Sequence, residues 1–156
     1  GDELKKLEDE KESMFREIYK DKVETIPYYL QFLEELKSRG FKTAVATSAP
    51  RANLDLIINA LKIEDKMDSM MASQDVQQHK PNPEVYLKSA ERVGVTPSDC
   101  VVFEDSFSGV TAGLNAGMKV VGVLSSHTKE ELPPCDFYIN DYSEVSVDKI
   151  LELLNS

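Results

Sequence analysis

Three groups of polar residues follow apolar runs of this sequence and carry hydroxyl, ammonium and carboxylate groups. Thr47 and Ser48 lie just ahead of a predicted helix, whose free backbone N–H groups favour an anion. Lys80 lies in a loop stiffened by prolines and could neutralise negative charge. Glu104 and Asp105 are adjacent carboxylates, which suit a hard cation such as Mg²⁺. Together these side chains could supply what chemistry on a phosphoryl group requires.

Each group also has an ordinary structural explanation. A hydroxyl residue such as Thr47 or Ser48 is most often a helix N-cap, and a single lysine such as Lys80 is most often solvated on the surface. An acidic pair can cap the next helix, whose N-terminus favours negative charge. The combination favours chemistry, because functional groups of open α/β sheets lie beyond the carboxyl ends of the strands. His79, beside Lys80, is assigned no role.

The charge balance narrows the classes of partner. The chain of 156 residues has a formal net charge of −10, which repels nucleic acid and anionic lipid. We therefore expect no nucleic-acid and no membrane partner, and any phosphate must be held by a few placed cations. The apolar runs are far shorter than a membrane span and the N-terminus is charged, so we expect a soluble, cytoplasmic protein. Cys100 and Cys135 lack metal-binding spacing and are expected to be ordinary thiols.

The periodicity of apolar residues predicts which elements carry these groups. The alternation of helices and strands implies right-handed crossovers and a mostly parallel sheet covered on both faces, so the fold class is α/β. A candidate boundary near residues 23–27 separates a heavily charged first helix from the alternating part. Helices are predicted over residues 3–20, 27–40, 50–61, 82–94, 106–116 and 147–154, and strands over residues 42–47, 67–73, 100–105, 119–124 and 137–140.

At this point the sequence resembles the haloacid dehalogenase superfamily, and within it the β-phosphoglucomutase-like branch of phosphatases and phosphomutases. Residues 46–48 read Ala-Thr-Ser, and residues 80–83 read Lys-Pro-Asn-Pro. Residues 101–110 read Val-Val-Phe-Glu-Asp-Ser-Phe-Ser-Gly-Val, followed by Ala-Gly-Met at 116–118. These stretches are similar to motifs II, III and IV of the family. The resemblance covers about residues 27–125 and implies a three-layer Rossmann-like core.

The resemblance implies a role for each of the five polar residues. Thr47 would hydrogen-bond the oxygens of the transferring phosphoryl group, aided by the backbone of Ser48. Lys80 would neutralise charge on the phosphoryl group and on the nucleophile, so Thr47 and Lys80 are the expected catalytic residues. Glu104 and Asp105 would bind Mg²⁺. Such placed charges match phosphoryl transfer, whose catalysis is mostly positioning and electrostatic stabilisation.

One part of the family pattern is missing from this chain. Motif I, Asp-x-Asp-Gly, would supply the nucleophile and the general acid/base, and the sequence has no such motif, so neither is assigned. Residues 1–24 resemble the last helix of the family's α-helical cap, and residues 25–156 resemble the Rossmann-like core. We therefore expect the C-terminal part of a longer hydrolase, inactive on its own.

The expected function belongs to that longer protein. It is a Mg²⁺-dependent phosphatase that acts on a small phosphorylated metabolite, such as a sugar phosphate, through an aspartyl-phosphate. The alternatives are a β-phosphoglucomutase-type phosphomutase and a non-catalytic domain that binds phosphate or a protein. Without motif I, a gap is expected between the strands that end at Thr47 and Asp105. We predict that a retained N-terminal fragment, a strand exchanged with another copy, or direct pairing of the two strands fills it.

Overall fold

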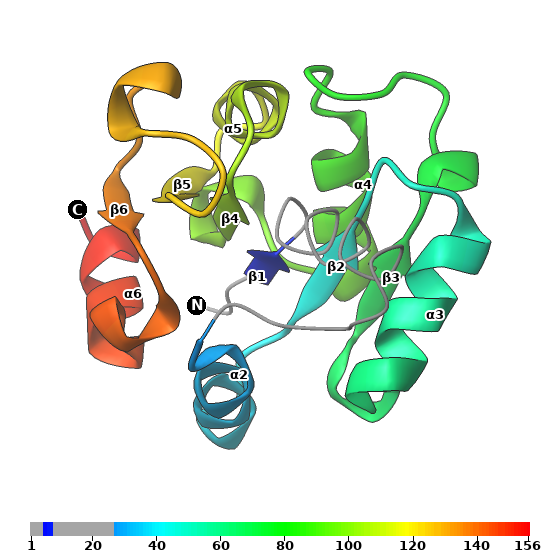
Figure 1. Ribbon diagram of the computed structural model, residues 1–156, viewed down its shortest axis with the longest axis horizontal. Coiled ribbons are helices and arrows are strands. Elements are labelled where there is room, and N and C mark those ends of the chain that lie inside the picture. Colours follow the sequence, from blue (N-terminus) through cyan, green and yellow to red (C-terminus); the bar gives the residue numbers. More distant parts are fainter. Residues whose placement is uncertain (1–4, 8–26) are drawn as a thin grey trace.

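A computed structural model describes residues 5–7 and 27–156, in which strands alternate with helices (Figure 1). No helix among these residues is long and apolar enough to cross a membrane. The α/β class predicted from the alternation is confirmed. The strands are β1 (Lys5–Leu7), β2 (Ala44–Ala46), β3 (Ser69–Met71), β4 (Val101–Glu104), β5 (Lys119–Val123) and β6 (Phe137–Ile139). The helices are α2 (Tyr29–Ser38), α3 (Arg51–Leu61), α4 (Glu84–Val93), α5 (Phe107–Asn115) and α6 (Val147–Leu154).

The strands pair in parallel throughout. One sheet has the order β1-β4-β5-β6, and β2 pairs with β3 in a second sheet. β1 also contacts β2, so it lies between β2 and β4 (Figure 1). The carboxyl ends of β4, β5 and β6 consequently lie at one edge of the first sheet, and those of β2 and β3 lie at one edge of the second.

Two hydrophobic cores lie on opposite faces of the strands, which gives the expected three layers. Val101 and Phe103 of β4 belong to the core under α2, α3 and α6, whereas Val102 belongs to the core under α4 and α5. The same alternation places Val45 and its neighbours Ala44 and Ala46 on opposite faces of β2. This is the period of two that a strand requires when both of its faces are covered.

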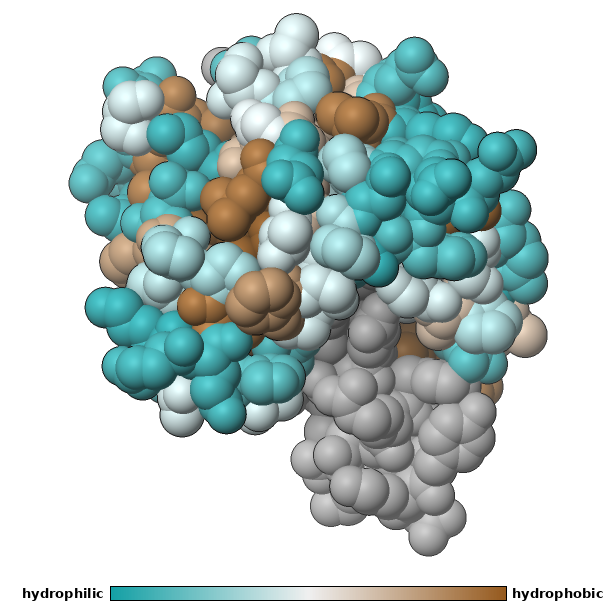
Figure 2. All heavy atoms as spheres, turned by 90° about the horizontal axis from the view of Figure 1, so that it is seen from above, coloured by the Kyte–Doolittle hydropathy of each residue, from teal (hydrophilic) through white to brown (hydrophobic). Residues whose placement is uncertain are grey.

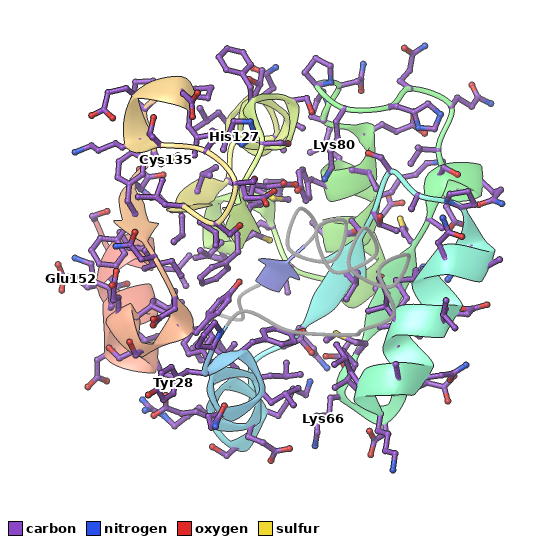
Figure 3. All side chains as sticks on the ribbon, in the orientation of Figure 1. Tyr28, Lys66, Lys80, His127, Cys135 and Glu152 are labelled. Carbon is purple, nitrogen blue, oxygen red and sulfur yellow. The ribbon has the colours of Figure 1, made fainter. Side chains whose placement is uncertain are left out.

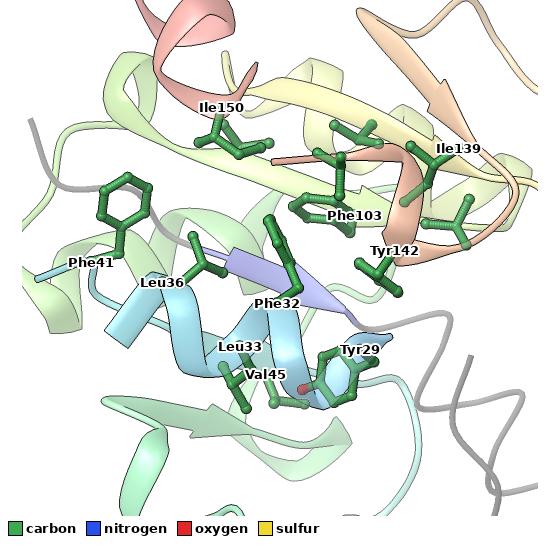
Figure 4. Close-up of a cluster of buried hydrophobic side chains, with 14 of the residues drawn as sticks. Tyr29, Phe32, Leu33, Leu36, Phe41, Val45, Phe103, Ile139, Tyr142 and Ile150 are labelled. Atoms are coloured by element: carbon green, nitrogen blue, oxygen red, sulfur yellow. The ribbon is translucent and has the colours of Figure 1, made fainter. Parts of the chain in front are cut away.

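Aromatic rings anchor β4 immediately before the acidic pair (Figure 4). The ring of Phe103 lies 5.7 Å from that of Phe32 on α2 and 5.6 Å from that of Tyr142, measured between centroids. Tilted and edge-on pairs at this separation add to the stabilisation from burial. β4 therefore ends in a rigid position, which fixes the backbone of Glu104.

The helix that follows the acidic pair packs closely on the sheet. A Cβ added at Gly113 of α5 would lie 2.9 Å from Cγ2 of Val120 and 3.4 Å from the Cβ of Val102. Glycine therefore permits an approach to β4 and β5 that a larger residue would prevent. At the other end of α5, Ser106 accepts a hydrogen bond from the Gly109 N–H at 3.0 Å, so the helix begins at a fixed point beside Asp105.

The predicted elements after residue 27 are confirmed, but the first predicted helix is wrong where the structure describes it. Residues 5–7 form β1 and pair with residues 101–103 of β4, although their local pattern favours a helix. The gain from pairing the backbone of β4 outweighs that local preference. Residues 1–4 and 8–26 lie outside the described residues, so the division into a cap remnant at 1–24 and a core at 25–156 stays a prediction.

β1 also changes the expectation of a gap in the sheet. Direct pairing of the strands that end at Thr47 and Asp105 is wrong, because β1 lies between them. A strand of this same chain therefore fills the position, a solution outside the three that we predicted. A retained fragment and an exchanged strand stay predictions.

Both cysteines are thiols, as predicted. Cys100 is buried, and its Sγ donates to the carbonyl of Thr96 at 3.3 Å. Burial raises the pKa of the Cys135 thiol to about 11. Cys135 is therefore protonated at neutral pH and is a poor nucleophile.

Candidate functional site

The two adjacent carboxylates are buried at the carboxyl end of β4. Glu104 is fully buried and Asp105 is 2% exposed. They are held there because the strand before them is covered on both faces and Ser106 starts α5 directly after them. Burial of two acidic side chains is costly, so each is expected to have a compensating partner.

Lys80 is the partner of Glu104. Its Nζ lies 2.5 Å from Oε2 of Glu104, and the two side chains are 4% and 0% exposed. The same ammonium lies 5.2 Å from the centre of the Tyr86 ring, on α4. Carboxylate and aromatic ring together hold a positive charge in a site that is almost free of solvent. The structure thus brings together two predicted site residues, one from a loop and one from the end of β4.

Asp105 has different partners, which come from the segment after β5. The hydroxyls of Ser125 and Ser126 donate to its Oδ2 at 3.0 and 2.9 Å. Nδ1 of His127 lies 2.8 Å from its backbone carbonyl oxygen. Burial raises the pKa of Asp105 above its ordinary value, and the hydrogen bonds from Ser126 and Ser125 offset part of that rise. Figure 3 shows His127 and Lys80 in the same upper part of the molecule.

Sequence reasoning missed Ser125, Ser126 and His127. Their signal was available, because they follow the apolar run of β5 as the acidic pair follows that of β4. The rule that functional groups lie beyond the carboxyl ends of strands applies to both runs.

Thr47 and Ser48 lie beyond the end of β2. Thr47 is buried, its N–H donates to the carbonyl of Met71 at 2.9 Å, and its Oγ1 accepts from the Ala49 N–H at 3.0 Å. Ser48 is exposed. The Thr47 hydroxyl therefore shapes the turn before α3 but does not cap that helix, because its N-cap is Pro50 and no side chain caps it. Its role toward a phosphoryl group stays a prediction.

The donor chemistry at this edge of the sheet fits a small hard cation at Asp105. A cation would offset the cost of burying the Asp105 carboxylate away from water. Mg²⁺ is usually bound through one or two carboxylates together with waters and substrate phosphates. Glu104 fits less well, because Lys80 already balances its charge. Among the described residues, no group of three or more His, Cys, Asp and Glu side chains could hold a metal ion. The described residues therefore do not complete a metal site, and the role of Asp105 as a Mg²⁺ ligand stays a prediction.

The surface near this edge is mainly polar. Figure 2 views the molecule from above the orientation of Figure 1 and shows hydrophilic residues over much of that face, with smaller hydrophobic patches among them. Exposed large apolar side chains on α4 and α5 are Leu87, Phe107 and Leu114. This surface suits the net charge of −10 and the expectation of a small-molecule partner.

Known proteins share both the sequence pattern and the fold. A phosphorylated carbohydrates phosphatase from Thermotoga maritima is 38% identical over 123 residues, which cover 78% of this chain and 55% of that protein. A crystal structure of a family IA, variant 3, haloacid dehalogenase hydrolase from Entamoeba histolytica matches with a TM-score of 0.83 and 26% identity, over 91% of this chain and 66% of that one. A β-phosphoglucomutase from Clostridium difficile matches with a TM-score of 0.75 and 27% identity, over 84% and 56% of the two chains.

These matches show the family of the chain, and the matched proteins are longer than the chain itself. The chain spans about half the length of the curated relatives it matches. Residues 2–123 match the family described as haloacid dehalogenase-like hydrolase, a range that includes Thr47, Lys80, Glu104 and Asp105. The chain therefore belongs to the haloacid dehalogenase-like hydrolases.

Proposed function

We propose that the protein containing this chain is a phosphatase that acts on a small phosphorylated metabolite, such as a sugar phosphate. The observation that carries the proposal is the buried Lys80 ammonium, held against Glu104 at the end of β4 and next to Asp105. Membership of the hydrolase family supports it, as does the relative named a phosphorylated carbohydrates phosphatase.

Lys80 supplies positive charge where the phosphoryl group reacts. A placed ammonium stabilises charge that develops in the transition state, and it does so more strongly in a site from which water is excluded. Glu104 acts on Lys80, because its Oε2 lies 2.5 Å from the ammonium. The carboxylate holds Lys80 in place before the substrate arrives.

Thr47 and Ser48 bind the phosphoryl oxygens from the β2 side. The N–H of Arg51, at the start of α3, already donates to Oε1 of Gln74 at 2.9 Å, so the proposed donors are the Thr47 hydroxyl and the backbone of Ser48. The acidity of the whole chain makes these local donors necessary, because its long-range field repels a phosphate.

Asp105 binds Mg²⁺ in the complete site. The bound ion would neutralise charge on the phosphoryl oxygens. Asp105 contributes a carboxylate that Ser125 and Ser126 hold in one orientation. The remaining ligands are not among the described residues, and neither are a nucleophile and a general acid/base.

The longer protein therefore carries the activity, through an aspartyl-phosphate formed on an Asp-x-Asp-Gly strand that this sequence lacks and that would take the place of β1 between β2 and β4. The 156-residue chain by itself is expected to be inactive. A phosphomutase is the second candidate function, favoured by the structural match to a β-phosphoglucomutase. A non-catalytic domain that binds phosphate or a protein is the alternative if no upstream motif I exists.

The test measures phosphate release by the longer protein from p-nitrophenyl phosphate and a panel of sugar phosphates, with and without Mg²⁺. Asp105→Asn and Lys80→Ala are expected to lower kcat by at least about a hundredfold, the scale seen when one electrostatic group is removed from an active site. His79→Ala is the control and should change little, since His79 is exposed.

Three outcomes separate the candidate functions. Release of phosphate that depends on Mg²⁺, Lys80 and Asp105 supports the phosphatase. Interconversion of sugar phosphates without release supports the phosphomutase. Vigorous turnover by the 156-residue chain alone, or normal kinetics in Asp105→Asn, would show that the site is misassigned.

A further inference from the structure

The segment of residues 125–127 makes four hydrogen-bond contacts with one buried residue, although the segment itself is exposed. Ser125, Ser126 and His127 all lie on the surface, whereas Asp105 is buried. Two of the contacts reach the carboxylate, and the other two, from Ser126 at 3.5 Å and His127 at 2.8 Å, reach the backbone carbonyl of the same residue. A surface loop is solvated without such contacts. Three surface residues that converge on one buried carboxylate therefore point to a positioning role.

We propose that this segment, the 125–127 clamp, positions Asp105 so that its carboxylate meets a cation through one oxygen only, and thereby favours Mg²⁺ over Ca²⁺. The proposal rests on the proposed function for the presence of the cation. It adds positioning residues and an ion selectivity that the family resemblance does not contain.

The two serine hydroxyls determine which oxygen faces the cation. Both donate to Oδ2 of Asp105, at 3.0 and 2.9 Å. A carboxylate oxygen has two lone pairs in its plane, and the two hydrogen bonds from the serines occupy them. Binding a cation through both oxygens at once would require Oδ2 to give up at least one of these bonds.

His127 holds the backbone from which that carboxylate projects. Its Nδ1 lies 2.8 Å from the carbonyl oxygen of Asp105 and 3.2 Å from Oγ of Ser126. A carbonyl oxygen can only accept, so Nδ1 carries the proton and donates it. The histidine therefore couples the backbone of Asp105 to the serine that holds its side chain, and the clamp acts as one unit.

A carboxylate limited to one oxygen suits Mg²⁺ better than Ca²⁺. Mg²⁺ demands near-octahedral geometry at short distances, roughly 2.0–2.1 Å, and takes single carboxylate oxygens together with waters. Ca²⁺ accepts about 6–8 oxygens at longer distances, including both oxygens of one carboxylate. By engaging Oδ2, the 125–127 clamp prevents binding through both carboxylate oxygens at once. Only the larger ion, Ca²⁺, uses that mode of binding well.

The test compares the affinities of both ions in the longer protein. Isothermal titration calorimetry measures Kd for Mg²⁺ and Ca²⁺ in the wild type, in Ser125→Ala/Ser126→Ala and in Ser125→Thr/Ser126→Thr. Removing hydrogen-bond partners of a metal ligand typically lowers metal affinity about 10- to 100-fold. We expect a loss of about tenfold for Mg²⁺ in the alanine variant, with Ca²⁺ affinity kept or raised.

The threonine variant keeps both hydroxyls and should retain the Mg²⁺ preference. Ser38→Ala is the matched control, since Ser38 is an exposed serine whose hydroxyl only donates to the carbonyl of Glu35, at the end of α2. A crystal structure of the alanine variant with Ca²⁺ should show both Asp105 oxygens on the ion. These readouts do not depend on turnover.

The outcomes separate this proposal from the proposed function. An alanine variant with the same ratio of Ca²⁺ to Mg²⁺ affinity as the wild type would overturn the clamp, even if the protein hydrolyses phosphate esters. A protein that loses selectivity in the alanine variant but hydrolyses no phosphate ester would support the clamp and contradict the proposed function. A wild type that binds no Mg²⁺ would overturn both.

Discussion

The ion pairs Lys80–Glu104 and Arg51–Asp75 have the same N···O distance of 2.5 Å but lie in very different surroundings. The side chains of the first pair are 4% and 0% exposed, and those of the second are 37% and 30% exposed. The first pair adjoins the end of β4, and the second joins α3 to the turn after β3. Equal distances therefore do not imply equal energies, because burial sets the cost of separating each pair from water.

Arg51–Asp75 is explained by the stability of its region. Oδ2 of Asp75 also accepts from the N–H of Ala72 at 2.7 Å, and Arg51 donates to the carbonyl of Met70 at 3.0 Å. The Ala72 hydrogen bond and the Arg51 guanidinium hold the pKa of Asp75 below its ordinary value. The pair thus satisfies backbone groups at the end of β3.

The stability of its region does not explain the Lys80–Glu104 pair well. Removing both charges from water costs several kcal/mol per ion, and an apolar pair of similar volume is often at least as stable. A buried pair of this kind is expected where a charge is needed for chemistry. The comparison therefore favours the edge of the sheet at β4 as the functional region, and the following variants test it.

The largest effect is expected for Lys80→Met. It leaves the Glu104 carboxylate buried without its cation, and such a change typically costs about 3–5 kcal/mol of the free energy of unfolding. Urea denaturation at neutral pH measures this. Lys80→Met/Glu104→Gln should recover most of the loss, because no buried charge remains. If the single and double variants are equally unstable, the pair is not the cause.

A smaller loss is expected for Asp75→Asn. It weakens a hydrogen bond from the Ala72 N–H and the pairing with Arg51, worth about 1–2 kcal/mol in total at neutral pH. Because the folded state lowers the pKa of Asp75, its contribution is present above pH 3.8 and is lost as the pH falls through the lowered value. Urea titrations across acidic pH should show the variant and the wild type converging at low pH.

Asp105→Asn should show the opposite dependence on pH. Burial raises the pKa of Asp105, so its folded-state advantage is complete below pH 3.8 and is lost as the pH rises through the raised value. The variant should therefore gain stability relative to the wild type as the pH rises through that interval, at no more than about 1.4 kcal/mol per pH unit for one proton. A difference that moves in the same direction as that of Asp75→Asn would contradict the assignment.

The smallest effect is expected for Arg51→Ala. The pair that it breaks is partly solvated, and exposed ion pairs contribute about 0.2–1 kcal/mol. Added salt should reduce the difference further, because it screens exposed charges. Thermal unfolding at low and high salt measures both. A loss as large as that of Lys80→Met would remove the distinction between the two regions.

Much of this molecule could be predicted from local patterns. The period of apolar residues predicted every α-helix and strand that the structure describes after residue 27, because each of these elements buries a face of its own. The polar residues at the ends of apolar runs predicted Thr47, Lys80, Glu104 and Asp105 as site residues, and the structure brings Lys80 and Glu104 into contact. The motifs around them also predicted the family.

The sequence by itself thus determined the α/β class, the family and the residue types gathered beyond the strands. Only the tertiary structure decided the pairing of those residues. In the folded chain Glu104 pairs with Lys80, 24 positions earlier, and Asp105 accepts hydrogen bonds from the segment after β5. The tertiary structure also made residues 5–7 a strand beside β4, against their local preference. The period of apolar residues shows which face of a segment is buried. The partners of Glu104, Asp105 and residues 5–7 depend instead on which segments the folded sheet brings side by side.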